Sequence, residues 1–286
     1  MHLKLIPIEY NDISYPSHIN CDIKEVAGHF DKSFLEAQGK YSLHTEYSYG
    51  KRKFNSPILS DYKTIIASQK KGIPQLWKSE KWALEFANFI IQLTNGIAPH
   101  IIEIHPPFSD YCDINTFIER YLIFEKAVKS VYPKCTIVIE NRAGSRYSGG
   151  KFILSKANDI SELIELLKIK NINLGVVIDF PQLLTAENLD TANMNFDKFS
   201  QCLEILKPHT DYIKGIHMWG KKKSPTGRWV SHCGTLDTFF LGNSPNKLCF
   251  INLITDLFDD DTPRFFVPEV NSSHEDLLSI VNDFFD

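Results

Sequence analysis

The sequence lacks the features that mark disulfide-rich, thiolate zinc-binding and membrane-spanning proteins. Its six cysteines form no Cys-x-x-Cys pair, so neither a thiolate zinc knuckle nor a disulfide framework is indicated. No apolar run approaches the length of a transmembrane helix, and the apolar stretch after Met1 is too short for a signal peptide. We therefore expect a cytoplasmic protein with reduced thiols and no membrane partner.

An excess of positive charge is missing too. The net charge is −4, so no global field attracts nucleic acid, although a local basic patch could still contact phosphates. Hydrophobic residues make up 43 % of the chain and charged residues 23 %, which is ordinary for a globular protein with a large core. At 286 residues we expect one domain, residues 1–286, of the size that α/β barrels commonly have.

Short apolar runs rich in Ile and Val predict buried strands, and apolar residues at three- and four-residue spacing between them predict helices. The predicted strands lie near residues 2–8, 40–46, 100–105, 135–140, 174–179, 212–217 and 264–269. The predicted helices cover residues 79–93, 114–131, 160–167, 195–206 and 274–285. Alternation of the two predicts an α/β fold with right-handed crossovers and a parallel sheet.

An open doubly wound sheet would need a Gly-rich phosphate-binding turn after an early strand, and the sequence has none. A closed (β/α)8 TIM barrel is therefore predicted, with one strand unassigned and an incomplete or irregular N-terminal strand allowed for. The Lys-, Ser- and Pro-rich segment 48–77 is predicted to be an insertion or a long loop.

Residue types that bind metal ions stand at the ends of six predicted strands, and a seventh follows in a loop. They are His44, His105, Glu140, Asp179, His217, Glu269 and, in the loop, His232. The C-terminal strand ends of a barrel converge on one rim, so these side chains should face one another. One such histidine alone is more often a hydrogen-bonded structural residue, but seven together favour a metal centre. Imidazole and carboxylate ligands suit Zn²⁺, Mn²⁺ or Fe²⁺. Glu103, one layer deeper, is predicted to be a buried carboxylate paired with a lysine.

Short motifs accompany these residues. They are His44-Thr45-Glu46-Tyr47, His105-Pro106, Glu140-Asn141-Arg142-Ala143-Gly144, Gly175-Val176-Val177-Ile178-Asp179, and His217 with Arg228 and His232. In these motifs the chain resembles the endonuclease IV group (AP endonuclease family 2) of the xylose-isomerase-like barrels. The resemblance covers most of the chain from residue 40 onward.

The resemblance implies a carboxylate-bridged metal cluster. Glu140 would be the bridge, with His44 and His105 on one ion, and the second ion would be held by Asp179, His217 and Glu269. The family's third ion would involve His232, but Gln182 and Val230 replace its other ligands, and Trp219 replaces an Asn of the family. We therefore expect two divalent ions, zinc or else manganese or iron, with His232 left to bind substrate or a proton.

Two bridged cations would activate a water for attack on phosphorus and neutralise the leaving oxygen. The first predicted function is therefore a metal-dependent phosphodiesterase or endonuclease acting on DNA or another phosphodiester, for example in repair of abasic sites. The predicted catalytic residues are Glu140, Glu269 and His232. The predicted substrate-binding residues are Tyr47, Arg142, Gln182, Trp219, Lys222 and Arg228, with Lys221, Lys223 and Arg146 adding to a basic rim. The alternative for the lysine run is a solvated loop.

Two other functions stay open at this stage. A sugar isomerase or epimerase would hold one ion with Glu140, Asp179, His217 and Glu269, and the two Glu would serve as acid and base. In that case His44 and His105 would have no metal role. A barrel that has lost catalysis and binds nucleic acid or acts as a scaffold is the third possibility.

Overall fold

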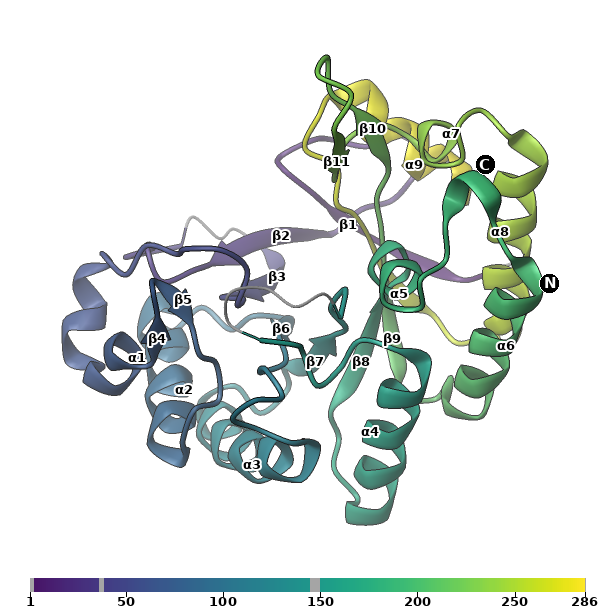
Figure 1. Ribbon diagram of the computed structural model, residues 1–286. Helices are drawn as coiled ribbons and strands as arrows, with labels where there is room; N and C mark the ends of the chain where they lie inside the picture. Colours follow the sequence, from purple (N-terminus) through teal and green to yellow (C-terminus); the bar gives the residue numbers. More distant parts are fainter. Residues whose placement is uncertain (1–2, 36–38, 145–149, 286) are drawn as a thin grey trace.

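The computed structural model describes residues 3–35, 39–144 and 150–285. Eight parallel strands close into a barrel in the order β1, β12, β9, β8, β7, β6, β3, β2 (Figure 1). The strands are β1 (Leu5–Glu9), β2 (Ile23–Gly28), β3 (Lys40–Thr45), β6 (Ile101–Ile104), β7 (Thr136–Glu140), β8 (Gly175–Asp179), β9 (Ile213–Met218) and β12 (Arg264–Pro268). The predicted TIM barrel is confirmed, and each of the seven predicted strands corresponds to one strand of the barrel.

The unassigned eighth strand is β2, which reads Ile-Lys-Glu-Val-Ala-Gly. Polar Lys24 and Glu25 interrupt its apolar residues, so it does not resemble the Ile- and Val-rich runs of the other strands. It pairs with β3 along its whole length, from Ile23 opposite Lys40 to Gly28 opposite Thr45. Among the described residues, the connections on either side of β2 contain no helix, which departs from a regular (β/α)8 alternation.

Long helices cover the outside of the rest of the barrel. They are α2 (Glu80–Thr94), α3 (Ile114–Val131), α4 (Ala157–Lys170), α6 (Phe196–Leu206), α8 (Ser244–Leu257) and α9 (His274–Phe285). Shorter helical turns are η1 (Pro57–Asp61), α1 (Lys63–Ala67), α5 (Phe180–Ala186), η2 (Thr191–Asn193), η3 (Lys207–His209) and α7 (Leu236–Phe239). Ser79 and Asp113 cap α2 and α3 by accepting hydrogen bonds from the first turn. The helix α8 was not predicted, because it exposes Leu248 and so lacks a clean apolar stripe.

The segment 48–77 lies in the crossover from β3 to β6 and carries η1, α1 and a small hairpin of β4 (Gln69–Lys70) and β5 (Ile73–Pro74). Its end is buried: the indole Nε1 of Trp77 donates a hydrogen bond to the carbonyl of His105 at 2.7 Å. The segment therefore helps to fix the backbone at a predicted metal ligand.

The barrel interior is layered because successive same-face residues of a strand lie two apart. Ile101, Val138, Val177 and Val267 form part of an apolar plug inside the barrel. Two residues further along the same strands come Glu103, Glu140, Asp179 and Glu269. The apolar plug thus lies directly below a layer of carboxylates and histidines. The hairpin of β10 (Lys221–Lys223) and β11 (Trp229–Ser231) follows β9 above the same end.

Candidate metal centre

The C-terminal strand ends bring two groups of potential metal ligands together. The first group is His44, Glu103, His105 and Glu140, and the second is Glu140, His217 and Glu269. Within each group, one ligand atom of every residue lies within 4.8 Å of the others. Glu140 belongs to both groups, as the sequence-based assignment of a bridge requires. Glu103 in the first group was not among the predicted ligands.

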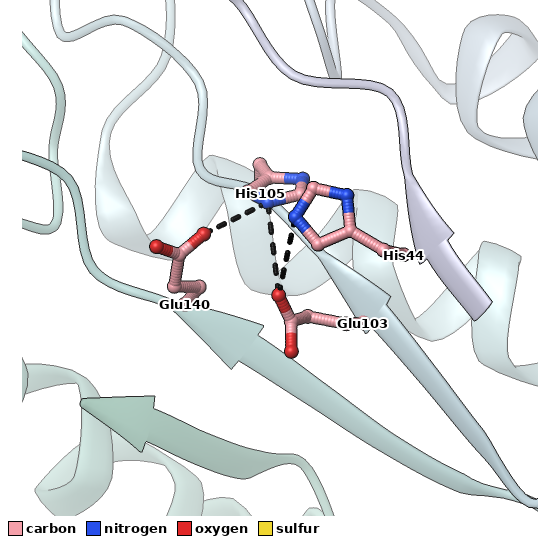
Figure 2. Close-up of side chains that lie close together, drawn as sticks. All are labelled: His44, Glu103, His105 and Glu140. Atoms are coloured by element: carbon pink, nitrogen blue, oxygen red, sulfur yellow. Dashed lines mark ion pairs between the residues drawn. The ribbon is translucent and has the colours of Figure 1, made fainter. Parts of the chain in front are cut away.

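Figure 2 shows the first group, with three strands pointing their side chains at a common centre. His105 Nε2 lies 2.9 Å from Glu140 Oε2, and Glu103 Oε1 lies 3.5 Å from His44 Nε2 and 3.9 Å from His105 Nε2. Ligand atoms ~2.0 Å from a tetrahedral zinc ion are ~3.3 Å apart, so these spacings suit one ion. His105 Nδ1 faces the carbonyl of Glu46 at 3.2 Å, which leaves Nε2 for the centre of the group.

The second group lies on the other side of Glu140. His217 Nδ1 is 3.2 Å from Glu269 Oε1 and 4.0 Å from Glu140 Oε1. The other ring nitrogen, Nε2, is 3.1 Å from Glu103 Oε2. The two carboxylate oxygens of Glu140 therefore face different groups, Oε2 the first and Oε1 the second.

Five buried carboxyl groups at this end of the barrel lie too close together to be ionised at the same time: Glu25, Glu103, Glu140, Asp179 and Glu269. Burial opposes the charged form of Glu140, but Arg142, whose Nη1 is 3.0 Å from Oε2, outweighs it and the pKa falls to about 2. Burial also opposes ionisation of Glu269, but His217 lowers its pKa to about 2. Burial and the charges of nearby carboxylates raise the pKa of the remaining three, which are Glu25, Glu103 and Asp179. Cations bound nearby would lower these pKa values and favour the ionised carboxylates.

The pKa values of two histidines of the groups, His44 and His217, are shifted in opposite directions. Burial and the neighbouring His105 hold the pKa of His44 well below its usual range. Burial opposes the charged form of His217 too, but Glu103 and Glu269 raise its pKa well above the ordinary value.

Three buried atoms in the two groups have no hydrogen-bond partner: Glu103 Oε1, His105 Nε2 and His217 Nδ1. His105 Nε2 and His217 Nδ1 are close to carboxylate oxygens, but at angles that do not make hydrogen bonds. Buried polar atoms without partners are rare, and metal coordination satisfies them. The residues present therefore fit divalent cations, with Glu140 between the two groups.

Asp179 is in neither ligand group of the described residues. It caps α5: Oδ1 accepts from the backbone N–H of Gln182 at 2.8 Å, and Oδ2 accepts from Gln182 Nε2 at 2.6 Å and from Trp219 Nε1 at 2.8 Å. Gln182 Nε2 also donates to Glu140 Oε1 at 2.6 Å, while its own oxygen accepts from the N–H of Ala143. Two residues at which the chain departs from the family motif thus engage the carboxylate that was predicted to be a ligand.

His232 also lies outside both groups among the described residues. Its ring stacks on Trp219, with centroids 4.3 Å apart, and its Nδ1 lies 3.1 Å from the carbonyl of Glu269 and 3.5 Å from Glu269 Oε2. Trp219 thus contacts both Asp179 and His232.

A cleft of about 1330 Å³ opens above these groups. Five of the predicted substrate-binding residues line it, namely Tyr47, Arg142, Gln182, Trp219 and Arg228. Lys222 pairs instead with Asp276 of α9 at 2.8 Å. Arg146 lies outside the described residues.

Sequence reasoning missed several residues at this end of the barrel. Glu103 was predicted to pair with a lysine, which is wrong: its ion-pair contacts are with histidines. Glu25 and His29 belong to β2 and the residue after it, so they were lost with that strand. Arg52, from the segment 48–77, stacks 4.3 Å from the Tyr47 ring centroid and donates to Glu46 at 2.6 Å. Once β2 is recognised, its end adds His29 to the same pattern of ligand types.

No protein-family model and no curated protein matches the sequence. Solved structures do match. A crystal structure named "AsfvAP:AG" aligns over 99 % of this chain and 97 % of that chain, with a TM-score of 0.57 and 11 % identity. The chain is a TIM barrel, and it shares its overall fold with this structure.

Two further barrels align with lower scores. An AP endonuclease of family 2 from Brucella melitensis gives a TM-score of 0.48 at 10 % identity, over 90 % of this chain and 98 % of that chain. A GH10 protein from Paenibacillus barcinonensis gives 0.49 at 8 % identity, over 93 % and 84 %. Likeness at these identities concerns the fold alone. Among the described helices, none is long and apolar enough to span a bilayer.

Proposed function

We propose that this chain is a metal-dependent enzyme that hydrolyses phosphodiester bonds in DNA, at abasic or otherwise damaged sites. The observation that carries the proposal is the pair of ligand groups that share Glu140 at the bottom of an open cleft. Two divalent ions bound there would lower the pKa of a water and neutralise charge on the departing oxygen.

The residues of the chain have distinct tasks in this proposal. His44, His105 and Glu140 would hold one ion, and His217 and Glu269 would hold the other together with Glu140. Arg142 keeps Glu140 ionised and presents its guanidinium to the cleft, where it can pair with a phosphate. His232, held by Trp219 and the carbonyl of Glu269, is near enough to the second group to exchange a proton with substrate.

The cleft is larger than a sugar pocket needs to be, and cationic side chains line it. Small-molecule sites usually measure about 300–1,000 Å³, whereas this cleft is about 1330 Å³. Arg142 and Arg228 line it, and Lys223 lies 5.3 Å from the ring of the exposed Trp229 at its edge. A phosphate backbone with an accessible base would find both charge and a stacking surface there. Tyr47 is less suited to stack on a base, because the guanidinium groups of Arg52 and Arg142 lie over its ring at 4.3 and 5.3 Å.

The sugar isomerase alternative is less well supported. It requires Asp179 as one of four ligands around a single ion. Asp179 accepts three hydrogen bonds from Gln182 and Trp219, and among the described residues it belongs to neither ligand group. The alternative also leaves His44, Glu103 and His105 grouped for no purpose.

The test is cleavage of a DNA duplex with one abasic site, using protein loaded with Zn²⁺ or Mn²⁺ and an intact duplex of the same sequence. We expect the abasic strand to be cut, EDTA to abolish cutting, and His105→Ala to lose more than the ~10–100-fold that outer-shell partners cost. The matched control is His100→Ala, an exposed histidine at the opposite end of the same strand. Failure to cut abasic duplex or single strands with zinc, manganese or iron would overturn the proposal.

A further inference from the structure

Glu103 is a carboxylate inside the barrel that the family motifs do not include. It is 3 % exposed and lies two residues beyond Ile101 of the apolar plug and two before His105. Placing a carboxylate at this depth is costly unless both of its oxygens are satisfied. Among the described residues, its ion-pair partners are histidines, with no lysine or arginine.

The two oxygens of Glu103 face different ligand groups. Oε1 is directed at the first group, 3.5 Å from His44 Nε2 and 3.9 Å from His105 Nε2, as Figure 2 shows. Oε2 is 3.1 Å from His217 Nε2, a hydrogen-bonding distance. The opposite nitrogen of that ring, Nδ1, is the one that faces Glu140 and Glu269.

A purely structural role accounts for only half of these contacts. A pair with His217 satisfies Oε2 but leaves Oε1 buried without a hydrogen-bond partner, and His105 Nε2 beside it is unpartnered as well. One cation among His44, His105, Glu140 and Glu103 would satisfy both atoms at once. The geometry of the first group therefore needs Glu103 as much as it needs either histidine.

We propose that Glu103 is a metal ligand through Oε1, completing a four-residue site with His44, His105 and Glu140, and that its Oε2 orients His217 as a ligand of the second ion. This inference rests on the metal centre of the proposed function, but not on the reaction. Four protein ligands fill a tetrahedral metal site, whereas a metal site that activates water keeps one coordination position open. Glu140, His217 and Glu269 would then be the group that leaves room for a water beside its ion.

The test is binding of Zn²⁺ alone to the metal-free full chain, followed by metal analysis after gel filtration. We expect about two zinc ions per wild-type chain and about one for Glu103→Gln and for His105→Ala. Because Oε2 steadies His217, Glu103→Gln should also weaken the remaining site by about 10–100-fold, while His105→Ala should not.

The matched control is Glu25→Gln. Glu25 is a second carboxylate of the barrel interior whose Oε2 is buried and unpartnered, but it belongs to neither ligand group. Glu25→Gln makes the same change of a carboxyl to an amide nearby, so this variant should keep about two ions. If Glu103→Gln binds as much zinc as Glu25→Gln with the same affinity, the inference is wrong.

Folding and function are separated by two further comparisons. Glu103→Gln takes away one partner of the buried pair with His217 and should lower the melting temperature of the metal-free protein. If this variant does not fold, Glu103→Asp asks the same question with the carboxyl group kept. Loss of one ion without any DNA cleavage by the wild type would support this inference and reject the proposed function. Cleavage with both ions retained in Glu103→Gln would reject the inference alone.

Discussion

The indole of Trp219 donates its Nε1–H to Asp179 Oδ2 at 2.8 Å, from the residue after β9, which pairs with the strand that ends in that aspartate. Gln182 donates to the same oxygen and to Glu140, so the carboxylate at the end of β8 is part of a hydrogen-bond network rather than of a ligand group. Gln182 and Trp219 are two of the positions where the sequence departs from its family resemblance. The departures are thus connected in space.

Asp179→Asn should keep about two zinc ions per chain but lower the free energy of unfolding by about 1–3 kcal/mol. Both oxygens of Asp179 accept hydrogen bonds, so the new amide N–H₂ must face a donor in either orientation. Metal analysis and urea denaturation measure the two effects. Loss of the only bound ion would instead support the isomerase alternative, in which this carboxylate is a ligand.

Zinc binding should release protons and weaken as the pH falls. Burial, chiefly, raises the pKa of Glu103, so this carboxyl holds its proton to higher pH than an ordinary glutamate, and carboxylates that outweigh burial raise the pKa of His217. Both groups must lose a proton to bind a metal ion in the proposed way. Calorimetric titration in two buffers with different ionisation enthalpies should give about one released proton or more per ion near pH 7. Equal heats in the two buffers would contradict this prediction.

Arg228→Gln should reduce the slope of log Kd against log salt for duplex DNA by about one, because one phosphate contact is lost. Arg228 is exposed and lines the cleft next to the hairpin that carries Lys223 and Trp229. The control is Lys170→Gln, which removes an exposed charge at the end of α4. Fluorescence anisotropy at several salt concentrations gives the slopes, and identical slopes for the two variants would show that the hairpin does not contact the backbone.

Asp260→Asn should lower the free energy of unfolding by about 2 kcal/mol at neutral pH. The side chain of Arg264 is fully buried at the start of β12 and makes two hydrogen bonds to Asp260, at 2.7 and 2.6 Å. These bonds hold the pKa of Asp260 below its usual range. Its contribution is therefore present above the unfolded-state pKa of about 3.9 and is lost as the pH falls through the lower folded value.

The neighbouring Asp261→Asn is the matched control for this pair. Asp261 pairs with Lys4 at 2.8 Å, but both side chains are more than half exposed, so the change should cost less than about 1 kcal/mol. Denaturation with urea between pH 3 and pH 7 compares the variants. A deficit of Asp260→Asn that stays constant over this range would contradict the assignment of the pH dependence to Asp260.

The strand ends could be predicted from the sequence because the backbone fixes them. Two-residue periodicity determines which side chains enter the barrel, and parallel strands bring their C-terminal ends to one rim. For that reason the sequence predicts that His44, His105, Glu140, His217 and Glu269 lie together at one rim, as they do in the two groups. The same rule would have found His29 if β2 had been recognised.

Which of the carboxylates at the rim belong to a ligand group, and which are engaged in hydrogen bonds, could not be predicted in this way. Glu103 and Asp179 both lie on interior-facing strand positions, yet Glu103 has an unpartnered oxygen and Asp179 has none among its contacts. The difference comes from donors supplied by other elements: Gln182 from α5 and Trp219 from the residue after β9. Such donors depend on the tertiary arrangement, which single-sequence patterns do not contain.

The central claim is a pair of metal ions bridged by Glu140. Anomalous diffraction at the zinc edge, from crystals of the full chain grown with Zn²⁺, tests it most directly. We predict two peaks about 3.5–4 Å apart, one beside His44 and His105 and the other beside His217 and Glu269. A single peak, or none in zinc-replete crystals, would contradict the account.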